Sequence, residues 1–421
     1  MSAARRTLEQ WLTLQESVHS RSIDLGLERV AAVARTLDVE RPAYRVITVG
    51  GTNGKGSTVT YLEAVLRASG VRTGLLTSPH LLRYNERIRI DGREAGDAEL
   101  VDVFERIEQA RGGTTLTFFE YNTLAALLLF ALQGIDVAVL EVGLGGRLDA
   151  TNLVAADVGV VCSVGFDHRD WLGDTLDAIG AEKAGIFRAR RPAVLGTPQM
   201  PPSVYAAIAH LAATPLVAER DFSWSTGERW NYRGLRVRLA DLPRPALQGD
   251  IQFRNAATAL AAIEALDPTL ALQAPAVGAA LQSVRLPGRF QIVPGPVEWL
   301  LDVAHNEPAA DVLAANLRAR PCSGRTIAVC GILQDKDAGA IGRVMAGLAD
   351  EWIAVSLPGA RGASARELAS RLAPVISVTA LADSVASGLA LARAHARPSD
   401  RVLVFGSFLT VAAALEWLQL Y

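Results

Sequence analysis

The chain has 421 residues, of which 50% are hydrophobic and 20% are charged, with a formal net charge of -2. This length predicts two domains, and the composition is typical of a folded globular protein. The weak charge excludes a nucleic-acid-binding or membrane-binding surface. Three cysteines are too few for a disulfide framework. No stretch is apolar enough to span a bilayer, and Glu9 and Glu16 interrupt any signal peptide, so we expect a cytoplasmic protein.

Short apolar runs alternate with helical segments through the first two hundred residues. We expect strands at 45–49, 73–78, 136–142 and 157–164, and helices that begin near Ser57 or cover 117–132 and 175–187. Strands that are apolar along their whole length are typical of a parallel sheet covered by helices on both faces. The sequence therefore predicts an α/β fold whose first sheet is mainly parallel.

The alternation then changes. Residues 216–245 include a stretch in which polar and apolar residues alternate, which predicts a small antiparallel ribbon against the main sheet, and a helix follows over 255–266. Prolines and glycine around 286–296 indicate a domain boundary. Beyond it we expect strands at 300–304, 326–330, 352–357 and 401–405. The prediction is a first domain over 1–290 and a smaller, Rossmann-like α/β domain over 291–421.

The sharpest motif is the glycine-rich segment Val49–Ser57, between the first strand and a helix. Glycines let backbone N–H groups approach phosphate oxygens, and the helix N-terminus adds partial positive charge. Lys55 can bridge the outer phosphates, and Ser57 can bind the associated Mg²⁺. The alternative is a glycine-rich turn with a solvated lysine. Lysine between Gly54 and Gly56 has no obvious packing role, so we favour a P-loop-type ATPase domain.

Gly56 separates Lys55 from Ser57, and this departure from the general phosphate loop resembles the variant found in the Mur ligase superfamily, which includes folylpolyglutamate synthases. Other blocks resemble that family in the same order. They are Thr77–Leu81, Asn85–Arg87, Glu141–Asp149, Asp167–His168, Glu182–Ile186, Leu286–Arg289 and Asp302–Asn306. The chain is thus identified as a member of the bifunctional dihydrofolate synthase/folylpolyglutamate synthase family.

The resemblance implies an ATP-dependent ligase that uses Mg²⁺ and joins L-glutamate to dihydropteroate and to reduced folates through an acyl phosphate. It implies an ATP-binding domain over 1–290, a glutamate-ligase domain over 291–421 and a monomer. One alternative is a monofunctional folylpolyglutamate synthase. Another is a Mur-type peptidoglycan-precursor ligase, although no extra N-terminal domain precedes the loop. A third is an ATPase that drives a protein partner.

For the metal, Glu141 ends an apolar strand at the sheet edge where α/β folds bind ligands, although a capping or surface acid is the alternative. The resemblance implies metal ligation by Ser57, Ser78, Glu141 and His168. It implies nucleotide binding by Gly54, Lys55, Gly56, Ser57, Asn255, Arg289 and Asp302, whereas Asn255 alone would be interpreted as a helix N-cap.

Lys55, Lys183 and His305 are the residues to which the resemblance assigns catalytic roles. It implies that Lys183 is carbamylated, whereas the residue alone would be interpreted as a solvated lysine. Asn306 follows His305 in the same loop. Family members commonly have proline directly after this pair, whereas here Glu307 comes before Pro308.

Three segments match the family's dihydropteroate-binding pattern. They contain Asp24, Leu25, Gly26 and Leu27; Phe118, Phe119, Glu120 and Tyr121; and Leu148, Asp149 and Ala150. Aromatic rings beside a carboxylate suit a flat heterocycle with N–H donors. Core packing is an equally good explanation of Phe118 and Phe119.

Overall fold

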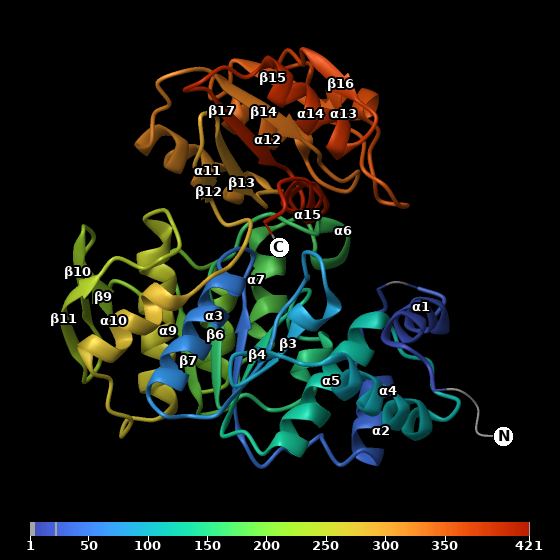
Figure 1. Ribbon diagram of the computed structural model, residues 1–421. Helices are drawn as coiled ribbons and strands as arrows, with labels where there is room; N and C mark the ends of the chain where they lie inside the picture. The colour runs from blue at the N-terminus through green and yellow to red at the C-terminus, as the bar shows by residue number, and fades with distance from the viewer. Residues whose placement is uncertain (1–4, 22, 421) are drawn as a thin grey trace. The chain divides into compact units, whose positions relative to one another are not determined.

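The computed structural model describes residues 5–21 and 23–420, which form two compact units (Figure 1). The first unit contains the residues up to 164, 171–245 and 253–284, and the second contains 165–170, 246–252 and the residues from 285 onward. Two short segments, 165–170 and 246–252, therefore belong to the second unit although the residues around them belong to the first.

An eight-stranded sheet forms the centre of the first unit, in the order β4-β3-β2-β5-β1-β6-β7-β8. Its strands are β1 (Arg45–Gly50), β2 (Thr73–Leu76), β3 (Ile88–Ile90), β4 (Arg93–Glu94), β5 (Val137–Glu141), β6 (Val158–Val161), β7 (Pro192–Leu195) and β8 (Thr214–Val217). Only the β2–β3 and β3–β4 pairs are antiparallel, so the sheet is mainly parallel, as predicted. The apolar side chains of β5 and β6 are buried, which fits a sheet covered on both faces.

Helices surround this sheet. They are α1 (Leu8–Val18), α2 (Glu28–Thr36), α3 (Lys55–Ala68), α4 (Asp97–Arg111), α5 (Phe118–Gln133), α7 (Leu176–Ala184), α8 (Pro202–His210), α9 (Ile251–Leu266) and α10 (Ala274–Ser283). A short helix, α6 (Arg169–Leu172), precedes α7, and the 3₁₀ turns are η1 (Tyr84–Arg87) and η2 (Ala150–Leu153). The main core lies where α1, α2, α4 and α5 pack together (Figure 1). α5 is apolar nearly all round and almost completely buried, as the sequence predicts.

A three-stranded antiparallel sheet of β9 (Ser223–Trp224), β10 (Arg229–Arg233) and β11 (Arg238–Pro243) forms the ribbon. β11 packs against α10, and α10 packs against α3. The ribbon therefore lies on the helix layer, whereas the sequence predicted contact with the main sheet. The alternating stretch that predicted it, 233–239, spans the turn between β10 and β11 rather than one strand.

The second unit has a six-stranded sheet in the order β12-β13-β17-β14-β15-β16. Its strands are β12 (Gln291–Val293), β13 (Glu298–Asp302), β14 (Thr326–Cys330), β15 (Glu351–Val355), β16 (Ala380–Ala382) and β17 (Arg401–Phe405), and its helices are α11 (Glu307–Ala319), α12 (Ala338–Met345), α13 (Ala365–Leu372), α14 (Val385–His395) and α15 (Phe408–Trp417). All strand pairs are parallel except β12 with β13. The second α/β unit thus agrees with the predicted fold class.

Within residues 5–21 and 23–420, no helix is long and apolar enough to cross a membrane. Cys162 and Cys330 are buried, and burial raises the pKa of both thiols, although Cys162 Sγ also donates to Thr58 Oγ1 at 3.4 Å.

Candidate active site

The glycine-rich loop leaves the carboxyl end of β1, which lies between β5 and β6 in the sheet. Gly51 has a positive φ of 141°, and a Cβ there would lie 3.1 Å from the backbone nitrogen of Cys162. Thr52 N donates to Ser163 O at 2.8 Å, so the loop is fixed against the end of β6. Only glycine fits this close approach, which leaves the loop backbone open to a phosphate.

Lys55 is the first residue of α3, after Gly54 as a left-handed N-cap. Its Nζ donates to Gly51 O at 2.9 Å and to Thr52 O at 3.2 Å. The ammonium is therefore folded over the loop, half-buried, and the alternative of a solvated lysine is wrong. A cation in this position can bind phosphate oxygens that lie in the same loop.

Asn255 lies beside the loop, because a Cβ on Gly54 would come within 2.9 Å of Asn255 Oδ1. It is in the second turn of α9, which begins at Ile251, so the helix N-cap alternative is wrong. The sequence placed the helix start four residues too late, although Asp250, a residue type preferred at helix N-termini, comes directly before Ile251. The predicted nucleotide contacts Gly54, Lys55, Gly56, Ser57 and Asn255 thus come together in the first unit.

Glu141 is only 3% exposed at the carboxyl end of β5. Its Oε2 accepts hydrogen bonds from the Thr77 hydroxyl and from Ser78 N, the latter at 3.2 Å. No ion pair within 4 Å in the described part of the chain includes this carboxylate, although the buried Arg87 guanidinium interacts with it electrostatically. The hydroxyl and carboxylate oxygens of Ser57, Ser78 and Glu141 are the hard donors that Mg²⁺ prefers, so the donor set fits this metal.

Arg87 was missed by the sequence analysis as an individual site residue. Its Nε donates to His80 Nδ1 at 2.6 Å, and its guanidinium lies 5.3 Å from the centre of the Phe118 ring. Burial lowers the pKa of Arg87, and burial together with this guanidinium lowers the pKa of His80 to about 4. His80 is therefore neutral near pH 7, and Arg87 supplies a buried positive charge close to a predicted pterin residue.

Lys183 lies in α7 and is only 4% exposed, so the alternative of a solvated lysine is wrong here too. The loop after β5 packs against the end of this helix: Arg147 N donates to Glu182 O at 2.8 Å, and a Cβ on Gly146 would lie 3.1 Å from Lys183 O. Burial of an ammonium is costly, which agrees with a group whose charge is altered by modification.

The three predicted pterin segments meet in the first unit, where α2 packs against both α5 and η2. Arg29 connects two of them. Its Nη1 lies 2.6 Å from Asp24 Oδ2, and its Nη2 donates to Glu120 Oε1 at 3.1 Å. Asp149 belongs to the third segment, and burial raises its pKa against the opposing hydrogen bond from Thr151.

Phe118 and Phe119 are both half-buried, so each has one part packed in the protein and another part accessible to a ligand. Phe118 packs against the core and contacts Tyr84 with ring centroids 5.7 Å apart. Phe119 lies against Gly143, where a Cβ would come within 2.8 Å of the ring.

In the second unit, Asp302 ends β13 and accepts hydrogen bonds from Phe290 N and Ala304 N, each at 2.8 Å. Burial raises the pKa of Asp302, although the Arg289 guanidinium opposes the shift. Arg289 lies 5.5 Å from the centre of the Phe408 ring, and the His305 ring is 6.0 Å from the same ring. The structure thus brings Arg289, Asp302 and His305 together.

Asp167 is the centre of a second cluster in this unit. Its carboxylate lies 2.6 Å from Lys336 Nζ, accepts from Asn306 Nδ2 at 2.8 Å and lies 3.7 Å from His305 Nε2. Burial alone would raise the pKa of Asp167, but His305 and Lys336 hold it well below its usual range.

His168 belongs to this cluster, with its Nε2 3.3 Å from Lys336 Nζ. The structure therefore places Ser57, Ser78 and Glu141 in the first unit and His168 in the second. Sequence analysis missed Lys336, which follows a strand of the second unit and is only 7% exposed. Glu307 does not interrupt the loop, because Asn306 caps α11 and Glu307 begins it.

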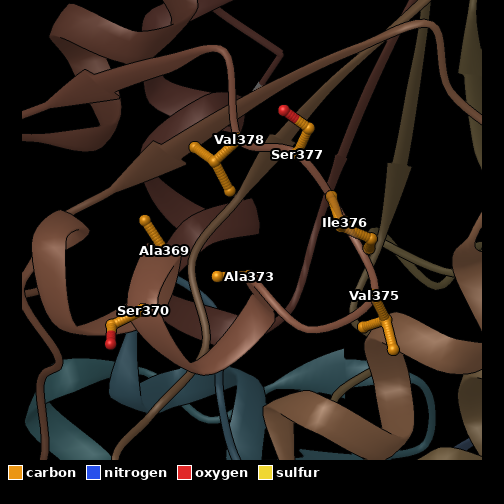
Figure 2. A pocket seen from close by; sticks show the side chains of 7 residues that line it. All are labelled: Ala369, Ser370, Ala373, Val375, Ile376, Ser377 and Val378. Carbon is orange, nitrogen blue, oxygen red and sulfur yellow. The ribbon is translucent and has the colours of Figure 1, made fainter.

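A hollow on the second unit lies apart from these residues (Figure 2). It is lined by Ala369, Ser370, Ala373, Val375, Ile376, Ser377 and Val378, where the segment after α13 passes beside that helix. No predicted site residue lines it, so it is not the candidate site.

Two family models match the chain. The Mur ligase middle domain matches residues 49–196, and the Mur ligase glutamate ligase domain matches residues 288–408. The dihydrofolate synthase/folylpolyglutamate synthase of Escherichia coli K12 is 45% identical over 416 residues, covering 98% of this chain and 96% of its own length.

Solved structures agree with these matches. The structure of E. coli FolC in complex with DHPP and ADP has a TM-score of 0.93 and 43% identity, covering 100% of this chain and 99% of that one. A bifunctional folylpolyglutamate synthase/dihydrofolate synthase with Mn, AMPPNP and L-glutamate bound has a TM-score of 0.90 and 44% identity, with 98% of each chain covered. The chain belongs to the dihydrofolate synthase/folylpolyglutamate synthase family of Mur-type ligases.

Proposed function

We propose that this ATP-dependent ligase joins L-glutamate to dihydropteroate, and to reduced folates, through an acyl phosphate. The observation that carries the proposal is the glycine-rich loop at the end of β1, with the Lys55 ammonium folded over it. The relatives that bind DHPP, ADP, AMPPNP and L-glutamate support the same substrates here.

The carboxylate of the acceptor is a poor electrophile, and phosphorylation makes it reactive. A carboxylate oxygen of the acceptor attacks the γ-phosphorus of ATP, and the bond to the β-phosphate breaks to release ADP. The glutamate amine then attacks the carbonyl carbon of the acyl phosphate, inorganic phosphate leaves, and the amine loses a proton. Positioning and electrostatic stabilisation supply most of the acceleration in such phosphoryl transfer.

The residues divide this work by location. In the first unit, backbone N–H groups of the loop and Lys55 bind and orient the phosphates, with Asn255 beside them. Ser57, Ser78, Glu141 and His168 are the proposed ligands of divalent metal, which would neutralise charge on the transferring phosphoryl group when bound. Arg289 and Asp302 contribute nucleotide contacts, His305 acts near the reacting groups, and carbamylated Lys183 supports the metal region.

The acceptor carries a pterin, and its site is formed by Asp24–Leu27, Phe118–Tyr121 and Leu148–Ala150. The convergence of these segments on α2, with buried carboxylates beside aromatic rings, supports this assignment. We assign the ATP-binding domain to 1–290 and the glutamate-ligase domain to 291–421, and we propose that the protein acts as a cytoplasmic monomer.

Replacement of Lys55 tests the proposal. Lys55→Ala should lower the rate of ADP release that depends on both dihydropteroate and glutamate by about 10³-fold or more, because the phosphate oxygens lose the ammonium that lies over the loop. Arg67→Ala is the matched control, since Arg67 lies on the same helix in an exposed pair with Asp91. Normal turnover by Lys55→Ala would refute the assignment, and ADP release by the wild type without acceptor and glutamate would favour a plain ATPase.

A further inference from the structure

Asp24 and Glu120 are two acidic side chains from segments 96 positions apart in the chain that come together around one guanidinium. Arg29 Nη1 lies 2.6 Å from Asp24 Oδ2, and Nη2 donates to both Asp24 O at 2.8 Å and Glu120 Oε1 at 3.1 Å. Glu120 is almost completely buried, and Asp24 is partly so. Without a cation between them, two carboxylates this close would repel each other.

Glu120 and Asp24, the two acidic partners of Arg29, each make a further contact within the protein. Glu120 Oε2 accepts from Thr117 N at 2.7 Å, which is the capping box at the start of α5. His19 Nε2 lies 3.1 Å from Asp24 Oδ2, and His19 Nδ1 lies 2.9 Å from Thr115 Oγ1. Two bridges, one through Arg29 and one through His19, therefore join the segment around Asp24 to the segment that leads into α5.

The bridge leaves one carboxylate oxygen available. Asp24 Oδ2 is shared by Arg29 and His19, whereas the partner found for Oδ1 in the described part of the chain is Arg21 at 3.7 Å, itself largely exposed. An oriented carboxylate oxygen at a substrate pocket can accept hydrogen bonds from the N–H groups of a heterocycle. Asp24 and Glu120 orient the guanidinium through its two Nη atoms. Its Nε is buried and has no hydrogen-bond partner.

From this geometry we infer that Arg29 is a positioning residue for the pterin end of the acceptor: it holds Asp24 against the first turn of α5, so that the Asp24–Leu27 and Phe118–Tyr121 segments form one preorganised pocket. The inference rests on the proposed function, because the pocket is that of the acceptor. Arg29 acts through Asp24 and Glu120, and its loss should weaken acceptor binding while the chemistry at the phosphate loop is unchanged.

Steady-state kinetics of Arg29→Met test the inference. The KM for dihydropteroate should rise about tenfold or more, with kcat and the KM values for ATP and glutamate changed less than about twofold, because only the acceptor pocket loses its order. Arg29→Lys keeps one cationic contact and should recover part of the loss. Arg35→Met is the matched control, since Arg35 lies on the same helix in a surface pair with Glu40; its KM should equal that of the wild type.

The possible outcomes separate the two claims. An unchanged KM for dihydropteroate in Arg29→Met overturns the inference, as does an equal loss for all three substrates. If Arg29→Met fails to bind ADP and is therefore misfolded, Arg29→Lys decides: a selective rise in the dihydropteroate KM supports positioning, and a wild-type KM contradicts it. Failure of the wild type to use dihydropteroate would instead overturn the proposed function.

Discussion

Single buried charges determine the chemistry that the first unit can support. Glu141 ends β5 with its carboxylate almost closed to water, and the hydrogen bonds from Thr77 and Ser78 orient it without neutralising it. A carboxylate in such a place favours a bound cation, because uncompensated burial of an anion is costly. The proposed metal role of Glu141 rests on this arrangement at the end of β5.

Replacement of Glu141 by glutamine keeps the size of the side chain and removes its charge. Glu141→Gln should lower kcat by about 10²-fold or more and raise the Mg²⁺ concentration needed for half-maximal ADP release. Glu94→Gln, at a solvent-accessible pair with Arg83, provides the control and should behave as the wild type. Equal Mg²⁺ titrations for Glu141→Gln and the control would show that this carboxylate has no part in metal binding.

The sequence predicted most residues around the phosphate loop, because loop, strand and helix are consecutive in the chain. It did not predict Arg29, since its two acidic partners lie 5 and 91 positions away and only folding brings them together. Lys336 was missed for the same reason: its partner Asp167 is 169 positions away. For Lys336 the position of a charged residue after a strand was a possible signal, whereas Arg29 lies in α2 before the first strand and had no such signal.

At the scale of elements, one buried acid connects the ribbon to α9. Glu264 accepts a hydrogen bond from the Tyr232 hydroxyl at 2.7 Å and from the backbone N–H groups of Arg236 and Val237 at 3.0 and 2.8 Å. The latter two residues form the turn between β10 and β11. A single carboxylate therefore satisfies three donors and holds the ribbon to the helix layer.

Removal of this acceptor should destabilise the first unit. Glu264→Leu leaves the three donors unsatisfied, and we expect a loss of about 3 kcal/mol in the free energy of unfolding, measured by urea denaturation. Glu264→Gln keeps one acceptor oxygen and should lose less. Equal stabilities for the leucine variant and the wild type would mean that water replaces these bonds at no cost.

The strands and long helices were predictable because their apolar periodicity is local. The parallel arrangement of the strands followed from the alternation of strands and helices along the chain. Element ends were less predictable. The helix expected at 255 begins at Ile251, directly after Asp250, so a local polar signal for its start was present and was not used. The strand expected at 157–164 ends at Val161, since the following residues turn towards the glycine-rich loop and bond to it.

At the scale of the whole molecule, Gly165–Asp170 comes directly after β6 in the chain yet belongs to the second unit. Asp167 accounts for this membership, because its carboxylate contacts Lys336 and Asn306 of that unit. No periodicity in the sequence indicates that this short segment belongs to the second unit. The second unit thus includes this segment, 246–252 and the residues from 285 onward, whereas the sequence predicted a single boundary at 290.

Asp167→Ala should destabilise the second unit by about 3 kcal/mol, because it leaves the Lys336 ammonium buried and unpaired. The double variant Asp167→Ala/Lys336→Met should recover part of this loss, which equilibrium unfolding would measure as a coupling energy. Asp335→Ala, in a largely exposed pair with Arg361, is the control and should cost less than about 1 kcal/mol. Additive effects of the two substitutions would show that the pair does not stabilise the unit.

The 42 basic residues other than histidine include only three lysines, at positions 55, 183 and 336, and every other cation is an arginine. None of the three is exposed: Lys55 is folded over its loop, and the other two are buried. Amine-directed chemistry on the folded protein therefore has almost no surface side chain to modify. A label that appears on Lys183 or Lys336 therefore reports local opening of the fold, whereas half-buried Lys55 can be modified without it.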